Sequence, residues 1–278
     1  MRPRGWICGL GLGVAGALWA QAPSVFDGGV VNAASFAQGQ PVAPGSLVSI
    51  FGSRFATSLL QADSIPLAVQ LADVSVTFNN IPAPLIAVIP EGPNNPAQIN
   101  AQLPWNVLPA GQTEGMATVV VQRGNDRSQP KQVPVGPFSP GIFAVNFGVG
   151  PAIAWFESPE PKGGKLAAAP GSIPGLTTFR ARAGDVLSLL ATGLGEVDPP
   201  VATGNNSMDQ LRWTKTKPEV LVGGVAAEVQ FWGLSPQFVG VNQVVFTIPS
   251  NAPKGDAVPL QLRVGGITST DRVTIAIE

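Results

Sequence analysis

A long internal repeat determines the domain organisation that this chain can adopt. Three phrases recur in the same order in both halves of the chain: PGSLVSIFGSRFA (44–56) as AGDVLSLLATGLG (183–195), DVSVTFNNIPAPL (73–85) as KPEVLVGGVAAEV (217–229), and QINAQLPWNVLPAG (98–111) as NQVVFTIPSNAPKG (242–255). Their separation far exceeds the roughly 20–50 residues of a solenoid repeat. The sequence therefore predicts two copies of one domain.

Each phrase has the pattern of a short strand followed by a turn. Residues 47–51 alternate in period 2 and carry apolar residues on both faces. Asn79-Asn80 and Gly223-Gly224 are residue types that tolerate the positive φ of a tight hairpin. The chain has 33 Gly and 28 Pro among 278 residues, and no stretch shows a capped helical period. We therefore predict an all-β chain of two tandem immunoglobulin-like β-sandwich domains.

The first 22 residues have the pattern of a secretory signal peptide. A basic start, MRPR, precedes an uncharged apolar run, WICGLGLGVAGALWA, and a small-residue site, AQA. The run is shorter than the ~20 residues that span a bilayer. We expect a protein that is secreted, periplasmic or held at the cell surface, with no membrane span in the mature chain. Cys8, the single cysteine, lies inside this run, so no disulfide is expected.

The repeat and the composition predict the domain boundaries. The first sandwich is expected at 24–150 and the second at 182–278, with a connecting segment and polar loop at 151–181. The run from 138 to 156 is too apolar for a free linker, since flexible linkers are polar and rich in Gly and Ser. Phe143 and Trp155 are therefore predicted to pack between the two domains.

Composition excludes several kinds of chemistry. The chain has no histidine, which rules out Ser-His-Asp catalysis and the usual zinc sites. Basic and acidic residues number 16 and 17, which gives no basic footprint for nucleic acid. Glu196 and Asp198 form a carboxylate pair in one loop, and Asn205, Asn206 and Asp209 lack the ordered spacing of a calcium loop. We predict no catalytic residues, no metal and no cofactor.

Tryptophan gives the best signal for binding. An exposed tryptophan on a β-sandwich can stack on a sugar or anchor a protein partner. Trp213 lies in a polar loop, and Trp105 follows a strand-ending proline and is replaced by Ser250 in the second copy. Trp232 has the strand context of a core or interface residue. Trp105 and Trp213 are therefore the candidate binding surface.

Several motifs together resemble a known family. They are GGVVNAASF (28–36), VAPGSLVSIFGSRFA (42–56), NNIPAPLI (79–86), QINAQLPWNV (98–107), SPGIFAV (139–145), ATGLGEVDPP (191–200) and VGGVAAEVQFWGLSPQFVGVNQV (222–244). In this order they resemble an uncharacterised C-terminal domain family of secreted Solibacter-type acidobacterial proteins. Each half more weakly resembles TIG-type immunoglobulin-like domains. The resemblance implies an extracellular β-sandwich and supplies no catalytic residues.

These observations favour a non-catalytic extracellular or cell-surface module with a structural or interaction role. Its partner is expected to be an extracellular protein or a polysaccharide. Two alternatives stay open, a carbohydrate-binding module for extracellular polysaccharide and a hydrolase that uses carboxylates.

Overall fold

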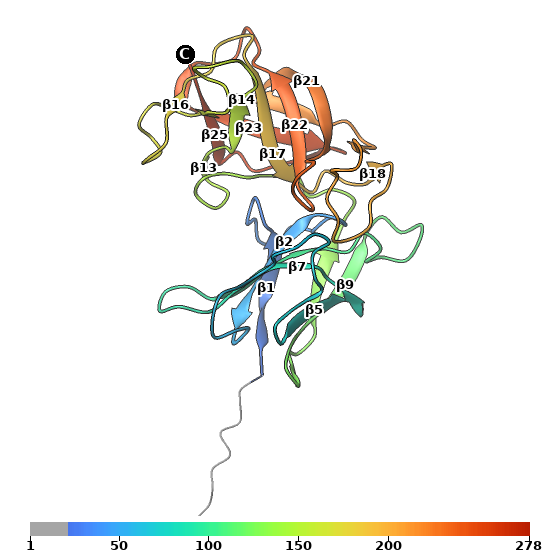
Figure 1. Ribbon diagram of the computed structural model, residues 1–278. Coiled ribbons are helices and arrows are strands. Elements are labelled where there is room, and N and C mark those ends of the chain that lie inside the picture. The colour runs from blue at the N-terminus through green and yellow to red at the C-terminus, as the bar shows by residue number, and fades with distance from the viewer. Residues whose placement is uncertain (1–21) are drawn as a thin grey trace, which may run out of the picture.

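The computed structural model describes residues 22–278, and every regular element in that part of the chain is a β-strand. The prediction of an all-β chain is confirmed. The predicted signal peptide lies outside the described residues, apart from Ala22. Figure 1 shows two lobes stacked along one long axis, with the C-terminus at the upper end. The lower lobe is the first half of the chain, residues 22–137, and the upper lobe is the second half, residues 138–278.

The strands of the first half are β1 (Ser24–Asn32), β2 (Leu47–Ser53), β3 (Leu60–Gln61), β4 (Gln70–Leu71), β5 (Val74–Phe78), β6 (Ile81–Pro82), β7 (Leu85–Ile89), β8 (Ala97–Gln102), β9 (Gly115–Arg123), β10 (Asp126–Arg127) and β11 (Lys131–Val135). The strands of the second half are β12 (Gly141–Ile142), β13 (Gly150–Pro151), β14 (Ala154–Phe156), β15 (Leu166–Ala167), β16 (Thr178–Phe179), β17 (Val186–Thr192), β18 (Val197–Asp198), β19 (Trp213–Thr214), β20 (Glu219–Val222), β21 (Val225–Leu234), β22 (Asn242–Thr247), β23 (Gly255–Val264), β24 (Ile267–Thr268) and β25 (Val273–Ile277).

Two sheets enclose the core of the first half. One sheet has the order β1-β2-β8-β7-β3, and the other has the path β10-β9-β5-β4, with β11 on β9 and β6 on β5. Both sheets supply residues to one core, among them Ile50 and Ile99 from the first sheet and Val76 and Phe78 from the second. Because side chains alternate across a strand, these residues point inward while their neighbours point outward.

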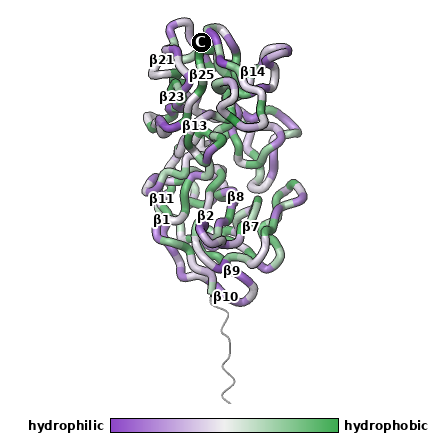
Figure 2. Tube along the Cα trace, turned by 90° about the vertical axis from the view of Figure 1, so that its left-hand side faces the viewer, coloured by the Kyte–Doolittle hydropathy of each residue, from purple (hydrophilic) through white to green (hydrophobic). Residues whose placement is uncertain are grey.

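The second half forms one continuous path of hydrogen-bonded strands, β13-β25-β23-β20-β21-β22-β17-β14-β15-β16. β21 joins its two parts, because its first residues pair with β20 and its later residues pair with β22. Phe156, Leu189, Phe246 and Leu260 are buried in the core. Figure 2 shows hydrophobic residues along the strands of both halves, while hydrophilic residues gather in outlying turns such as the one near β10.

The repeated phrases occupy matching places in the two halves. β2 pairs with β8 as β17 pairs with β22, and β5 pairs with β9 as β20 pairs with β23. The β7–β8 and β21–β22 ladders each contain a register shift. Asn79-Asn80 and Gly223-Gly224 have positive φ at both positions, as a two-residue hairpin turn requires.

The structure corrects the predicted domain boundary. Segment 151–181, expected to connect the domains, contributes strands to the sheet of the second half: β14 pairs with β17, β15 with β14, and β16 with β15. Phe156 and Ala167 from this segment are buried in the second core. That core therefore begins with Ile142, well before residue 182. Strands of two or three residues are too short to leave a periodic pattern in the sequence.

Buried hydrogen bonds join the two halves. Thr192 Oγ1 accepts from the backbone N–H of Leu47 at 3.0 Å and donates to the carbonyl of Gly240 at 2.7 Å. Asn32 Nδ2 donates to the carbonyl of Ser139 at 2.7 Å. Thr192 and Asn32 are almost inaccessible to solvent, so these bonds form inside the junction. Over residues 22–278, no helix is long and apolar enough to span a bilayer.

Candidate binding surface

A row of paired residues crosses the outer face of the second-half sheet. Trp155 on β14 lies opposite Ser188 on β17, Ser188 lies opposite Val245 on β22, and Val245 lies opposite Phe231 on β21. Directly paired residues point to the same face of a sheet. Their neighbours along β14, β17 and β22 fill the core: Ala154, Phe156, Leu187, Leu189, Val244 and Phe246. The row therefore lies on the face of the sheet opposite the core, where Ser188 is buried and the other three residues are half-buried.

Trp213 continues this row at its β21 end. It lies on the short strand β19, opposite Gly233, and 37% of its surface is exposed. Its ring centre lies 4.7 Å from that of Phe231 and 4.8 Å from that of Trp232, both in edge-to-face geometry. Lys217 Nζ lies 4.4 Å from the centre of the Trp232 ring. We name Trp155, Val245, Phe231 and Trp213 the aromatic strip.

Ring contacts hold the exposed end of the aromatic strip in place. Edge-to-face aromatic pairs add about 0.5–1.5 kcal/mol beyond the area that they bury. A tryptophan fixed in this way loses little conformational entropy when a partner covers it. Trp232 itself is half buried and packs against the second core, which agrees with its strand context. Trp213 is thus a rigid aromatic group on the surface, the type of residue that dominates binding energy at interfaces.

Trp105, the other predicted binding residue, lies at the junction. Its ring covers the backbone of Gly45, where a Cβ atom would come within 2.2 Å of the ring. Its backbone N–H donates to Thr203 Oγ1 of the second half at 3.2 Å. The ring lines a groove of about 400 Å³ together with Leu108 and Phe138. Among the described atoms, Nε1 of Trp105 is buried without a hydrogen-bond partner. Trp105 therefore contributes to the contact between the halves.

Phe143 and Trp155, the two residues predicted to pack between the domains, lie in different places. Phe143 is half buried at the junction, where it lines a groove with Leu47 and Ile86 of the first half. Trp155 lies on the aromatic strip instead. Its partner on β17 is Ser188, and Thr192 on the same strand is the residue that bonds to the first half. These two residues are four positions apart, which is about 13 Å of strand. Strand alternation turns Trp155 outward because Ala154 and Phe156 fill the core.

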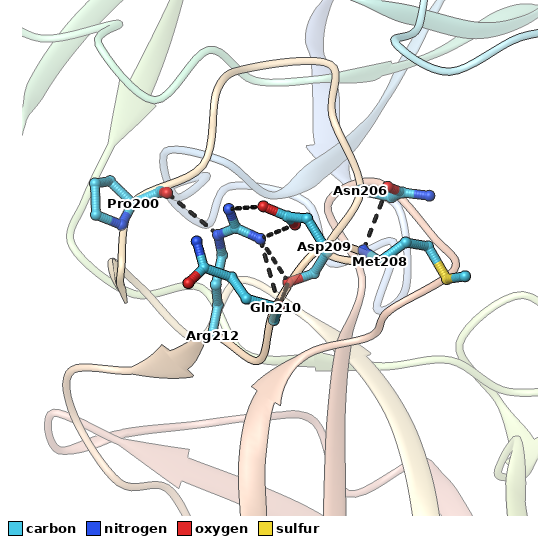
Figure 3. Close-up of polar contacts among 7 residues, drawn as sticks. Pro200, Asn206, Met208, Asp209, Gln210 and Arg212 are labelled. Carbon is cyan, nitrogen blue, oxygen red and sulfur yellow. Dashed lines mark hydrogen bonds and ion pairs between the residues drawn. The ribbon is translucent and has the colours of Figure 1, made fainter.

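The loop that carries Asp209 is organised by an arginine. Figure 3 shows the Arg212 guanidinium inside this loop, bonded to both carboxylate oxygens of Asp209 at 2.5 and 2.9 Å. It also donates to the carbonyl of Pro200 at 3.2 Å and to Ser207 Oγ at 3.1 Å. The Arg212 side chain is 6% exposed. The hydrogen bonds from Arg212 lower the pKa of Asp209 to about 2. Both carboxylate oxygens of Asp209 therefore accept hydrogen bonds from Arg212.

The same loop reaches the first half. The backbone N–H of Gly204 donates to Gln102 Oε1 at 2.7 Å, and its carbonyl accepts from the N–H of Leu67 at 2.9 Å. Arg212 therefore fixes the shape of a loop that docks across the junction.

The two candidate hydrolytic acids, Glu196 and Asp198, lie near one lysine, Lys215. Glu196 accepts from Lys215 Nζ at 2.7 Å, and this bond raises the pKa of Lys215. Asp198 lies on β18, directly opposite Trp213. Within residues 22–278, no group of three or more Asp, Glu, Cys or His side chains is placed to hold a metal ion.

Phe231 and Val245 are the members of the aromatic strip that sequence reasoning missed. The phrase VQFWGL places Phe231 next to Trp232, so one of the two had to face outward. A register shift between Val229 and Phe231 decides which one, and the sequence gives no sign of that shift.

Comparison with known proteins adds little to these observations. No family model matches the chain, and no curated protein matches it. Among solved structures, it is similar to a surface glycan-binding protein from Prevotella bryantii, at 12% identity and a TM-score of 0.26 over 92% of this chain and 41% of that one. It is also similar to domains 5–6 of the S-layer protein SbsC, at 12% identity and a TM-score of 0.26 over 91% and 99% of the two chains. The chain thus spans under half of the glycan-binding protein.

Proposed function

We propose that this chain is a non-catalytic, extracellular interaction module built from two immunoglobulin-like sandwiches. It binds another macromolecule outside the cell through the aromatic strip. The observation that carries this proposal is the exposed Trp213, held rigidly by Phe231 and Trp232 at the end of an outward-facing row. Covering the exposed part of that ring removes apolar surface from water, which is favourable by about 25 cal/mol per Å².

The second half supports this role through its framework. Phe231 and Trp155 are held by ladders of β21, β22, β17 and β14, and rigid elements position binding residues better than loops do. The motifs that resemble the family of secreted acidobacterial proteins agree with an extracellular place of action. The sandwich pattern and the resemblance to TIG-type domains belong to the same proposal.

The test compares binding by variants of the mature chain. The extracellular fraction of an acidobacterial culture is passed over the immobilised protein, and each captured macromolecule is purified and titrated. We expect Trp213→Ala and Phe231→Ala to weaken binding at least about tenfold, because truncated aromatic anchors commonly cost 1.4 kcal/mol or more. Leu211→Ala is the matched control, since Leu211 is a 59% exposed apolar residue near Trp213 but outside the strip.

Unchanged affinity in both folded strip variants would contradict the proposal. A hydrolytic activity on a glycoside that disappears in Glu196→Gln would instead favour the carboxylate hydrolase.

A further inference from the structure

The groove that Phe143 lines at the junction has a volume of about 300 Å³, and both halves contribute to its lining. Its floor is the outer face of β2 and β8, which presents Ser49, Gln98 and Asn100. Its walls include Phe36 of the first half and Phe147 of the second half. No ionisable side chain lines it. We name it the phenylalanine groove.

The two phenylalanine walls are unusual for surface residues. Phe147 is 77% exposed, and its ring centre lies 5.9 Å from that of Phe36 at an interplanar angle of 80°. Both residues have left-handed backbones, with φ of 47° and 52°. Bulky side chains rarely adopt this conformation, and each such residue costs about 1–3 kcal/mol. Because the ring of Phe147 is mostly exposed, its burial offsets little of this backbone strain. The stability of the fold therefore does not explain why Phe147 occupies this position.

The backbone around both walls is anchored by the two halves. The N–H of Phe36 donates to the carbonyl of Asn32 at 2.9 Å. The carbonyl of Ser35 accepts from the Arg272 guanidinium at 3.1 Å, and a Cβ atom on Gly148 would meet the same carbonyl at 2.6 Å. Only glycine allows the two segments to approach this closely. The backbone that carries both walls is therefore held by contacts between the two halves.

The floor is a hydrogen-bonded network with an unused donor and an unused acceptor. Asn100 Oδ1 accepts from Ser49 Oγ at 2.9 Å and from Gln98 Nε2 at 2.7 Å. Gln98 Nε2 also lies 3.2 Å from Ser49 Oγ. This network fixes the orientation of both amides and leaves Asn100 Nδ2 and Gln98 Oε1 without a partner among residues 22–278. A free amide N–H and a free carbonyl oxygen on one groove floor match hydroxyl groups, which both donate and accept.

From these features we infer that the phenylalanine groove is a binding site for a neutral polysaccharide. Aromatic walls cover the apolar faces of a sugar ring, and the amides of the floor bind its hydroxyls. The absence of charge in the lining disfavours an acidic or a basic ligand. A peptide in strand form is disfavoured as well, because β2 and β8 are each paired on both sides and have no backbone groups left to offer.

The test is affinity electrophoresis of the mature chain in gels that contain one polymer each. The neutral probes are mixed-linkage β-glucan, xyloglucan, galactomannan and dextran; alginate is the acidic probe and gelatin the peptide probe. We expect retardation by at least one neutral polymer, and a dissociation constant at least about tenfold higher for Phe147→Ala and for Asn100→Asp. Phe147 is exposed, so its truncation leaves the fold intact, as a circular dichroism melt verifies.

Two controls make the result specific. Phe26→Ala removes another exposed phenylalanine of the first half, outside the groove, and should bind like the wild type. Trp213→Ala, which damages the aromatic strip, should also keep its affinity for the neutral polymer. This separates the groove from the strip, so either proposal can fail alone. No retardation by any neutral polymer, retardation by alginate or gelatin alone, or equal affinity of Phe147→Ala would each overturn the inference.

Discussion

Arg212 shows how one residue can fix a loop that has no regular structure of its own. Its guanidinium satisfies a carboxylate, two backbone carbonyls and a hydroxyl, all within 13 residues of chain from Pro200 to Arg212. Such planar, bidentate recognition is specific to arginine. Asp209 completes the arrangement, and its ionisation makes the loop sensitive to acid.

The first prediction concerns pH at this residue. The pKa of Asp209 in the folded chain, about 2, lies below its ordinary value of 3.8. A depressed carboxyl pKa stabilises the folded state above the ordinary value, and that contribution is lost as the pH falls through the folded value. Wild type should therefore exceed Asp209→Asn in free energy of unfolding above about pH 4, and the difference should shrink towards pH 2. Urea titrations between pH 2 and 6 measure it.

A double mutant supplies the control for this prediction. In an Arg212→Gln background the largest cause of the lowered pKa is gone, so the pH-dependent effect of Asp209→Asn should be much smaller. A difference of unchanged size in that background would assign the pH dependence to another group.

The two-residue turns determine how the strands of each hairpin pair, because they set its register. Asn80 has φ of 63° and is exposed at the turn between β5 and β6. A β-branched residue is strained there, so Asn80→Val should lower the free energy of unfolding by about 1–2 kcal/mol. Asn125→Val is the matched control, because Asn125 is exposed in a turn but has no positive φ. Equal destabilisation by both changes in urea titrations would show that φ is not the cause.

Sequence reasoning succeeded where elements repeat and alternate. The strands β2, β8, β17 and β22 and the turns at Asn79-Asn80 and Gly223-Gly224 all follow from the doubled phrases. It failed for β14, β15 and β16, which have three residues or fewer and lie among Pro and Gly. The pairing of such short strands is decided by the sheet edge that receives them and not by local preference.

The two proposed binding surfaces were only partly predictable for a related reason. Trp213 was identified by its polar neighbours, and it is exposed. The phenylalanine groove depends on Phe36 and Phe147, which lie far apart in the sequence and outside the repeated phrases. Only the junction brings these two rings together, and its geometry depends on buried bonds that leave no pattern in the sequence.

The junction couples the two halves of the molecule. Thr192→Val removes a buried hydroxyl and leaves the Leu47 N–H and the Gly240 carbonyl unpaired, at a cost of about 1–3 kcal/mol each. Calorimetry should show one cooperative transition for the wild type and two for this variant, since the loss falls on the contact between the cores. Thr247→Val is the control, because its hydroxyl bonds to the exposed Gln230. Separate transitions already in the wild type would contradict this coupling.

The arrangement of the terminal strands bears on how the molecule responds to tension. β1 begins at the far end of the lower lobe and runs towards the junction, whereas the chain ends at the top of the upper lobe (Figure 1). A pull between these two ends would load β1 along its length against β2, and the bonds of an antiparallel ladder lie perpendicular to its strands. The bonds of that ladder would then resist together, in shear, and would not unzip one by one. A module anchored through its N-terminal end and holding a polysaccharide at the junction would pass the drag on that polymer through the β1–β2 ladder.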